Sequence, residues 1–493
     1  MLATILIDCS NILIVEGYMG EIASSAGVGV RKAPRITTGY ARYVFWIMFA
    51  ISFLNYMDRY VLSGAINIIA KELNFGIAGI GYISSAFLVV YTLGTLPLGI
   101  WADRAQRKTV VASCVATWSV ITALTALATS FTTLFLVRML LGVGEAGYFP
   151  AGTALMSDYF SRSRRSRIMS WWNVAQVVGI LFGTAIGGVV AGLYTGAWRL
   201  AFIFTGIPGL LLAWLAWRLR EPRRNQADEE AAELDPEARV ANIEGEEPRS
   251  TLSISQGVGA QIRSLLRIKT VLVLTVMQIF AFFVLYVSVT FLATYLQQRD
   301  IFGLSSGVAG IFSGGVIALA GLVGTVAGGY LADALNRRYP GARVLVCGIG
   351  FLLSAPAFAL AITTHNLTVF TIFFVLTAIL ITLYQGPSTA AIQDVVPSFL
   401  RATAVCVVLL IAHLLGDAFS PTIVSVLAAS FDPTHGLHFK NSVAGGDLSL
   451  ALLITCVPAL VIAGLVGIFG ARWMGGDIVA AEQADRQAKA LEG

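Results

Sequence analysis

The chain has 493 residues, of which 57% are hydrophobic and only 12% are charged, and its mean hydropathy is +0.78. Soluble globular proteins carry about 25% charged residues, so this composition excludes an ordinary cytosolic enzyme, a disordered protein and a fibrous protein. The net charge of +5 is too small for a nucleic-acid-binding protein, in which a basic stripe is expected.

Residues 1–38 are expected to form a disordered cytoplasmic N-terminus, because their apolar start lacks the positive segment of a signal peptide. Twelve apolar runs follow, each long enough for a membrane-spanning helix of about 20 residues. They cover residues 41–69, 78–101, 109–129, 132–157, 166–193, 199–219, 270–297, 307–332, 343–363, 367–391, 402–429 and 447–472.

A polar cytoplasmic linker at residues 220–265 separates the first six runs from the last six. It contains an acidic block from Asp228 to Glu247 and several prolines, a composition that disfavours independent folding. The sequence therefore predicts an all-α polytopic membrane protein with 12 transmembrane helices in two six-helix bundles. The bundles occupy residues 39–219 and 266–473, and residues 474–493 form a cytoplasmic tail.

Lys and Arg residues concentrate on one side of the predicted membrane. In short loops such residues mark the cytoplasmic face. Two Arg residues lie inside spans, and the opposite loops hold only Lys71, Arg199, Arg299 and Lys440. Both termini and the linker are therefore predicted to be cytoplasmic, and we expect a multi-pass protein of a bacterial inner (cell) membrane.

Cysteine and histidine spacing offers no disulfide or metal framework. The five cysteines are far apart in the sequence, and most lie in apolar runs. His435 and His438 lie near Asp432, but a solvated loop is favoured over a metal site because no further ligand is offered. No metal or cofactor is predicted, and the lack of a Gly-x-x-x-x-Gly-Lys-Ser/Thr motif indicates that ATP is not used.

Two loops of the first half recur in the second half, which predicts a duplicated six-helix unit. The segment 99–108 recurs at 329–338, and the pair Asp158/Arg165 recurs as Asp394/Arg401. Acidic and basic side chains at these helix ends can pair and latch the two bundles; the alternative is the positive-inside bias alone. The predicted cytoplasmic gate consists of Gly99, Asp103, Arg104, Arg107, Lys108, Asp158, Arg165, Asp333, Arg337, Arg338, Asp394 and Arg401.

Ionisable residues inside the predicted spans are costly in lipid and therefore indicate function. Asp58 lies about 24 Å from the cytoplasmic end of its helix, and Arg138 and Glu145 are two turns apart on one helix face. Asp58 and Glu145 are candidates for proton exchange, whereas Arg59 and Arg138 can hold an anionic group. The alternative is a static ion pair, such as Asp58 with Arg59 or Glu145 with Arg138.

The second half offers polar and aromatic groups in its spans. Tyr286 and Thr290 lie in span 270–297 among several phenylalanines, and Tyr384 lies in span 367–391. A cavity that is charged on one side and aromatic on the other suits an amphiphile whose anionic head lies at Arg59. The predicted substrate-binding residues are Arg59, Arg138, Tyr286, Thr290 and Tyr384.

Two further patterns lie in spans 166–193 and 402–429. Glycines at 179, 183, 187 and 188 allow close helix packing, and they also give a smooth face along which two bundles can slide. His413 and Asp417 are four residues apart and share a helix face. They form either a proton relay or a structural pair beside Pro421.

The loop at 99–108 resembles the signature of the major facilitator superfamily, Gly-x-x-x-Asp-Arg-x-x-Arg-Lys/Arg. It departs from that signature at Gln106, where Gly is usual, and the second copy has Ala334 in place of Arg. The resemblance covers roughly residues 40–472, including the span number and the central linker. It implies the fold of that superfamily and transport by alternating access.

Within the superfamily, the segments 55–60, 142–148 and 413–421 resemble the Spinster family of proton-linked or facilitative lysolipid and sphingolipid carriers. The resemblance implies that Asp58 and Glu145 are protonation sites and that Arg59 meets the substrate head group. The stretch Tyr148-Phe-Pro-Ala is also similar to anion:cation symporters for organic acids such as hexuronates.

The predicted function is secondary active transport, coupled to protons, of an anionic or amphiphilic, lysolipid-like small molecule. The alternative is a proton/organic-anion symporter for small carboxylates such as sugar acids. A membrane enzyme would need a catalytic cluster, for which only His413 and Asp417 are candidates, and a receptor would usually carry a soluble domain. Expected partners are the substrate, protons and the lipid bilayer, with no nucleic acid, and we expect a monomer, as is usual among relatives.

Overall fold

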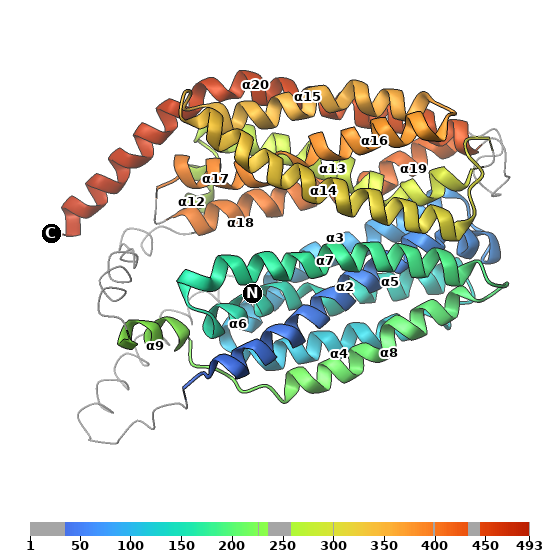
Figure 1. Cartoon of the computed structure of the whole chain (residues 1–493), viewed down its shortest axis with the longest axis horizontal. Helices are drawn as coiled ribbons and strands as arrows, with labels where there is room; N and C mark the ends of the chain where they lie inside the picture. The colour runs from blue at the N-terminus through green and yellow to red at the C-terminus, as the bar shows by residue number, and fades with distance from the viewer. Residues whose placement is uncertain are drawn as a thin grey trace.

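The structure is a computed structural model that describes residues 35–224, 226–234, 258–298, 300–397, 400–431 and 444–492. The described residues form long helices that run side by side in two groups (Figure 1). Most of the expected disordered N-terminus, much of the linker and the pair His435/His438 lie outside the described residues.

The first group contains the helices that precede the linker, and it is called here the first half. Its fourth span is interrupted at Gly147, between α5 and α6. The helices are α2 (Thr38–Glu72), α3 (Ile77–Arg104), α4 (Arg107–Thr125), α5 (Phe131–Ala146), α6 (Tyr148–Tyr159), α7 (Arg162–Ala191) and α8 (Trp198–Trp217). Two short helices follow in the linker region, α9 (Gln226–Leu234) and α12 (Val258–Leu265).

The second group, called the second half, repeats this plan. Its tenth span is interrupted at Leu383 and Tyr384, and its eleventh contains one π-helical turn. The helices are α13 (Lys269–Gln297), α14 (Ser306–Asn336), α15 (Ala342–Thr363), α16 (Leu367–Thr382), α17 (Gln385–Val395), α18 (Arg401–Ala412), η2 (His413–Asp417), α19 (Ser420–Phe431) and α20 (Ala444–Glu492).

The helices confirm the predicted all-α polytopic fold. Within the described residues, 11 segments are long and apolar enough to cross a membrane. The remaining predicted span is the first, 41–69, which is α2; it has 35 residues but contains Asp58 and Arg59, which lower its hydropathy. The twelve predicted spans therefore agree with the helices, and α20 continues as a helix through most of the expected tail.

Three glycines spaced by four residues fit α7 against α2 inside the first half. A Cβ atom at Gly179, Gly183 or Gly187 would collide with backbone of α2. The carbonyl oxygens concerned belong to Phe53, Met57 and Val61. The predicted close packing is thus present, but these three glycines join two helices of the same half rather than forming a sliding face between halves.

Gly188 is the member of this series that faces the second half. A Cβ atom at Gly188 would collide with the carbonyl oxygen of Ser306, and one at Gly310 with that of Thr184. On the other flank of the same interface, the backbone N–H of Thr422 in α19 donates to Ser85 Oγ in α3, at 3.2 Å. The two halves therefore meet through α7 with α14 and through α3 with α19.

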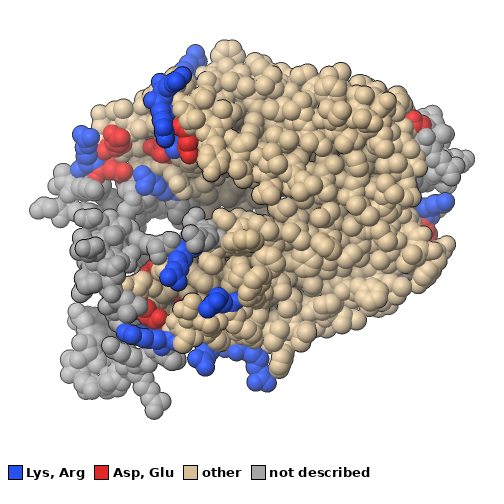
Figure 2. Space-filling view, in the orientation of Figure 1, with Lys and Arg blue, Asp and Glu red and all other residues tan. Residues whose placement is uncertain are grey.

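Charged residues gather at one end of the molecule, where α2 begins (Figure 2). This end holds Arg104, Arg107, Lys108, Arg337 and Arg338 and is called the basic end; the opposite end, which holds Glu72, Gly192 and Gln297, is called the far end. Figure 2 shows a hollow between the two halves toward the basic end. The contacts of Gly188 and Ser85 with the second half lie toward the far end.

Candidate functional site

Arg59 of α2 and Glu145 of α5 form a buried ion pair in the first half. The Nη2 atom of Arg59 donates to Glu145 Oε2 at 2.6 Å, and its Nε atom donates to the same oxygen at 3.1 Å. The Glu145 side chain is fully buried, whereas Arg59 is 13% exposed. The pair differs from both static pairs suggested by spacing, which joined Arg59 to Asp58 and Glu145 to Arg138.

Three aromatic rings surround the guanidinium group of Arg59. Its carbon lies 4.7 Å from the ring centre of Tyr91, 5.1 Å from that of Phe87 and 5.2 Å from that of Tyr56. Cation–π attraction of this kind is worth about 0.5–2 kcal/mol for each ring. The rings hold the cation at the cavity wall. Sequence reasoning did not single out Phe87 and Tyr91, because α3 carries no charged residue near them.

Glu145 lies in the last turn of α5, directly before the interruption of the span. α5 ends at Ala146 and α6 begins at Tyr148, with Gly147 between them. Non-helical backbone at membrane depth is tolerated where it lies within protein or lines a cavity. The Oε1 atom of Glu145 has no hydrogen-bond partner within the described residues. The interruption therefore leaves one carboxylate oxygen of the pair open to a new partner.

Asp58 is completely buried one residue before Arg59 and points elsewhere. Its Oδ2 atom accepts a long hydrogen bond of 3.5 Å from Thr122 Oγ1, and its Oδ1 atom has no partner among the described residues. A buried carboxylate without an ion pair is costly, and taking up a proton removes that cost. The predicted proton sites Asp58 and Glu145 thus have different surroundings.

Arg138 is also buried, and it forms no ion pair with Glu145, although both lie on the same helix. Its guanidinium carbon lies 5.0 Å from the ring centre of Phe202, and its Nε and Nη2 atoms have no hydrogen-bond partner in the described part of the chain. Buried polar groups are normally paired, so these two donors call for a partner. A bound anion or a water molecule could supply it.

A small cavity brings the two halves together beside Arg59 and Arg138. Its volume is about 20 Å³, room for about one water molecule. Tyr60 and Ser84 line it from the first half, and Tyr286 and Thr290 of α13 line it from the second. Four of the five predicted substrate-binding residues therefore surround one cavity.

Tyr384, the fifth predicted substrate-binding residue, does not line that cavity. Its buried ring lies 5.4 Å from the ring of Phe351, and its carbonyl oxygen faces Cys347. Tyr384 lies at the interruption between α16 and α17, the counterpart of Gly147 in the first half. The interruption fixes its backbone within the second half.

His413 and Asp417 form the predicted pair within the π-helical turn η2. The Nδ1 atom of His413 lies 2.8 Å from Asp417 Oδ2, and the His413 ring lies 4.7 Å from the ring of Phe282. The Oδ1 atom of Asp417 has no partner within the described residues. Single π-helical turns occur frequently at functional sites.

At the basic end, the two halves contain matching ion pairs. Arg107 pairs with Asp158, and Arg343 pairs with Asp394 and, at 3.3 Å, with Asp333. Arg343 and Asp394 each lie 236 positions after their counterparts in the first half. The sequence comparison missed Arg343 because it aligned this loop at an offset of 230, which matches Arg107 with Arg337.

The remaining predicted gate residues form local contacts. Arg165 donates to Asp228 of α9 at 2.8 Å, and Lys108 Nζ donates to the carbonyl oxygen of Leu219 at 2.8 Å. Arg401 Nε donates to the carbonyl oxygen of Gln393 at 2.9 Å. Arg104, Arg337 and Arg338 are exposed, Gly99 is half-buried, and the side chain of Asp103 lies outside the described residues.

Glu221, which the sequence reasoning did not single out, caps the beginning of α4. Its carboxylate accepts hydrogen bonds from the backbone N–H groups of Arg107 and Lys108, at 2.7 Å and 3.0 Å. A carboxylate at a helix N-terminus is stabilised by the unpaired amides there. The linker therefore begins with a residue that is bound to the first half.

Comparison with known proteins places these features in a family. Residues 48–421 match the Major Facilitator Superfamily model. Protein spinster of Drosophila melanogaster is 27% identical over 384 residues, 77% of this chain and 60% of the fly protein, so the chain spans less than two thirds of that relative. The probable galactarate/D-glucarate transporter GudP of Bacillus subtilis (strain 168) is 28% identical over 304 residues, 60% of this chain and 65% of GudP.

A solved structure has the same fold. The bacterial homologue of the human lysosomal transporter Spinster, in an inward-facing and unoccupied conformation, superposes with a TM-score of 0.77. It is 26% identical, and the match covers 90% of this chain and 99% of that one.

Proposed function

Because the chain belongs to the Major Facilitator Superfamily, resembles Spinster transporters and is a secondary transporter, we propose that it couples proton movement to transport of an anionic, amphiphilic small molecule. The observation that carries the proposal is the buried pair of Arg59 and Glu145. One member of that pair binds anions, and the other binds protons.

The pair links substrate binding to protonation by competition. An anionic group that approaches Arg59 competes with the carboxylate of Glu145 for the same guanidinium group. Once Glu145 loses this partner, it is a buried charge, and a proton neutralises it. Conversely, a proton on Glu145 releases Arg59 for the anion. Such coupling is reciprocal, so substrate and proton strengthen each other's binding.

Asp58 supports the proposal as a second proton site in the same half. Its carboxyl group is buried and makes no ion pair within the described residues, while the nearby Arg138 has unpaired donors there. The charge enclosed when the cavity closes depends on whether Asp58 carries a proton. Protonation therefore shifts the balance between the conformation open at the basic end and the one open at the far end.

We propose that the basic end is cytoplasmic and that the conformation described here faces the cytoplasm. The excess of Lys and Arg at this end supports that orientation. The hollow between the halves toward the basic end, with Gly188 and Ser306 in contact toward the far end, agrees with it (Figure 2). We place the chain in a bacterial inner membrane, where it works as a single chain.

The matching pairs at the basic end support a gate that closes when the cavity opens at the far end. Arg107–Asp158 and Arg343–Asp394 each lie within one half in the present conformation. When the halves approach at this end, the same groups come within reach of the opposite half. The proposed gate therefore exchanges partners within a half for partners across it.

The substrate proposed here has an anionic head and an apolar body. Arg59 and Arg138 supply the cationic wall, and Tyr286 with Phe87 and Ile83 supplies the apolar wall. A sugar acid is the second candidate, favoured by the similarity to the galactarate/D-glucarate transporter of Bacillus subtilis. Both candidate substrates carry an anionic group that would bind Arg59 in competition with Glu145.

Uptake into proteoliposomes tests the proposal. Purified protein is reconstituted, an inward proton gradient is imposed, and uptake of radiolabelled lysophosphatidylglycerol is compared with that of D-glucarate. We expect the gradient to stimulate uptake of one of them, and Glu145→Gln to abolish the stimulation. Glu482→Gln, an exposed site in α20, is the matched control and should behave as the unmodified protein. Uptake of both compounds without response to the gradient would contradict proton coupling.

A further inference from the structure

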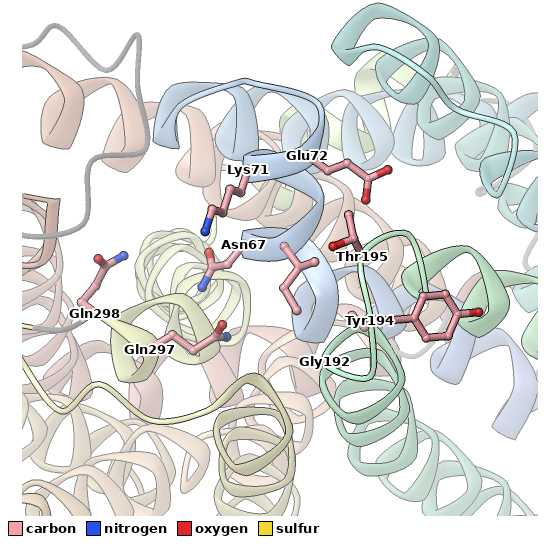
Figure 3. Close-up of a pocket in the computed structure, with 10 residues that line it drawn as sticks. Asn67, Lys71, Glu72, Gly192, Tyr194, Thr195, Gln297 and Gln298 are labelled. Atoms are coloured by element: carbon pink, nitrogen blue, oxygen red, sulfur yellow. The ribbon is translucent and has the colours of Figure 1, made fainter.

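A second and larger cavity lies at the far end of the molecule. Its volume is about 630 Å³, within the range of small-molecule sites. Figure 3 shows its lining from the last turns of α2, the end of α7 with the loop that follows, and the end of α13. Asn67 lies eight residues after Arg59 on α2, about 12 Å further along the helix. The cavity is therefore separate from the Arg59 site.

One side of this far-end cavity is polar and positively charged. Lys71 is exposed and forms no ion pair within the described residues, and the Oδ1 atom of the buried Asn67 has no hydrogen-bond partner there. Figure 3 shows both side chains pointing toward the end of α13, where Gln297 and Gln298 lie. An unpaired cation thus stands beside an unpaired buried acceptor.

The other charged residue of the lining, Glu72, is already neutralised. Its Oε2 atom accepts from Trp198 Nε1 at 2.8 Å, and its Oε1 atom pairs with Arg199. Its side chain points away from Lys71, toward Thr195 (Figure 3). The charge left without a partner in the lining is therefore the single positive charge of Lys71.

The backbone at the end of α13 and the side-chain amide of Gln297 are held in place before any ligand arrives. The carbonyl oxygen of Gln298 accepts from the N–H groups of Phe302 and Gly303, at 3.1 Å and 2.7 Å. Gly303 has φ +61°, a conformation that favours glycine. The Nε2 atom of Gln297 donates to the carbonyl oxygen of Ala293 at 3.0 Å, which leaves its Oε1 atom to accept from a ligand. A prearranged site loses less entropy on binding.

The lining combines both halves of the transporter. Lys71 and Asn67 belong to the first half, and Gln297 and Gln298 belong to the second. The cavity is complete only while the halves are together at the far end, as they are here. A ligand that bridges them stabilises this conformation relative to the one open at the far end.

We propose that the far-end cavity binds a hydroxylated oxyanion, either a carboxylate or a phosphate ester that also carries hydroxyl groups. Lys71 holds the oxyanion, Asn67 Oδ1 accepts from a hydroxyl group, and the glutamine amides bind the rest. The inference rests on the proposed function for the substrate class, since the transported anion itself would occupy this site before it enters or after it leaves the Arg59 site.

Cysteine protection tests this binding without any transport. Thr195→Cys places a thiol in the lining of the far-end cavity. A membrane-impermeant maleimide, added on the side of the proteoliposome membrane where the far end is exposed, labels this thiol. No proton gradient is imposed. The unmodified chain supplies the background labelling. The probes are sn-glycerol 3-phosphate, which represents a lipid head group, D-glucarate, which represents a free sugar acid, and glycerol, which is neutral.

At a probe concentration four times its Kd, labelling should slow about fivefold with one or both oxyanions and remain unchanged with glycerol. Lys71→Gln should remove the protection, and Lys269→Gln, the same change at the basic end, should retain it. Tyr194→Cys, a second exposed lining position, repeats the measurement. Equal labelling with and without the oxyanions at both positions, or protection that survives Lys71→Gln, would overturn the proposal.

The outcome is independent of proton coupling. Protection that depends on Lys71 supports the far-end site even if Glu145→Gln still responds to a proton gradient. Failure of both oxyanions to protect removes the site but leaves the Arg59 and Glu145 exchange in place. Slower labelling with D-glucarate alone would assign the site to a free sugar acid rather than to a lipid head group.

Discussion

Arg59 and Glu145 are 86 positions apart in the sequence, yet their side chains meet at 2.6 Å inside the first half. The contact joins α2, shortly after the middle of that helix, to the last turn of α5, next to the interruption at Gly147. It brings a permanently charged anion-binding group to a group that can gain or lose a proton.

Replacing Arg59 by lysine should weaken binding of anionic ligands by about tenfold or more, although the charge is kept. Two nitrogens of Arg59 bind one oxygen of Glu145, and its flat group lies against three rings, a geometry that an ammonium group does not reproduce. Titration of the purified protein with an anionic and a neutral amphiphile gives the comparison. Equal weakening for both ligands would point to a folding defect instead.

Asp58→Asn should abolish stimulation of uptake by a proton gradient while leaving the fold intact. The amide has nearly the same shape as the acid, and Asp58 has no ion pair within the described residues to lose. The melting temperature should therefore stay within a few degrees of the original, corresponding to less than about 1 kcal/mol. Uptake by Asp58→Asn that still follows the gradient would remove this residue from the coupling mechanism.

Gly188→Ala should destabilise the contact between the halves at the far end by about 1–3 kcal/mol, the usual cost of overpacking. The added methyl group would collide with the carbonyl oxygen of Ser306, so the halves should move apart there. Distances between spin labels placed on α7 and α14 near that end measure the shift. Gly39→Ala is the control, since nothing lies within 4 Å of a Cβ atom there, and it should leave the distances unchanged.

Arg343→Gln should lower stability more than Arg337→Gln does. Arg343 pairs with Asp394 and Asp333, whereas Arg337 is exposed. Loss of these charge-assisted bonds should cost roughly 1 kcal/mol or more, and the exposed site should cost within about 0.5 kcal/mol. Thermal unfolding of the two variants in one detergent decides between them. A larger loss for Arg337→Gln would support the 230-residue alignment of the loops instead.

The sequence predicted the helices well because a span needs about 20 apolar residues, and this requirement is local. Partners of charged residues were harder to predict. Spacing along one helix suggested Glu145 with Arg138, but α5 turns Glu145 toward Arg59 on α2, which depends on how two distant helices pack. The pair of His413 and Asp417 was found because its members lie one turn apart.

The matching ion pairs at the basic end were hard to predict from the sequence for a different reason. The offset of 236, already visible in Asp158 and Asp394, leads from Arg107 to Arg343, but the shorter motif at an offset of 230 was more conspicuous. The two offsets differ partly because the loop before α15 is longer than the loop before α4, and partly because α14 continues further beyond its aspartate than α3 does. Equivalent positions in a duplicated unit therefore have to be traced through the helices and not only through the loops.

The seam between α7 and α14 consists largely of backbone at Gly188 and Gly310. Glycine has no rotamers to freeze, so re-forming this seam after each opening loses almost no side-chain entropy at these positions. At these two positions, loss of side-chain entropy therefore does not oppose the joined conformation. Bulky interlocking side chains at these positions would add an entropic cost each time the two halves joined.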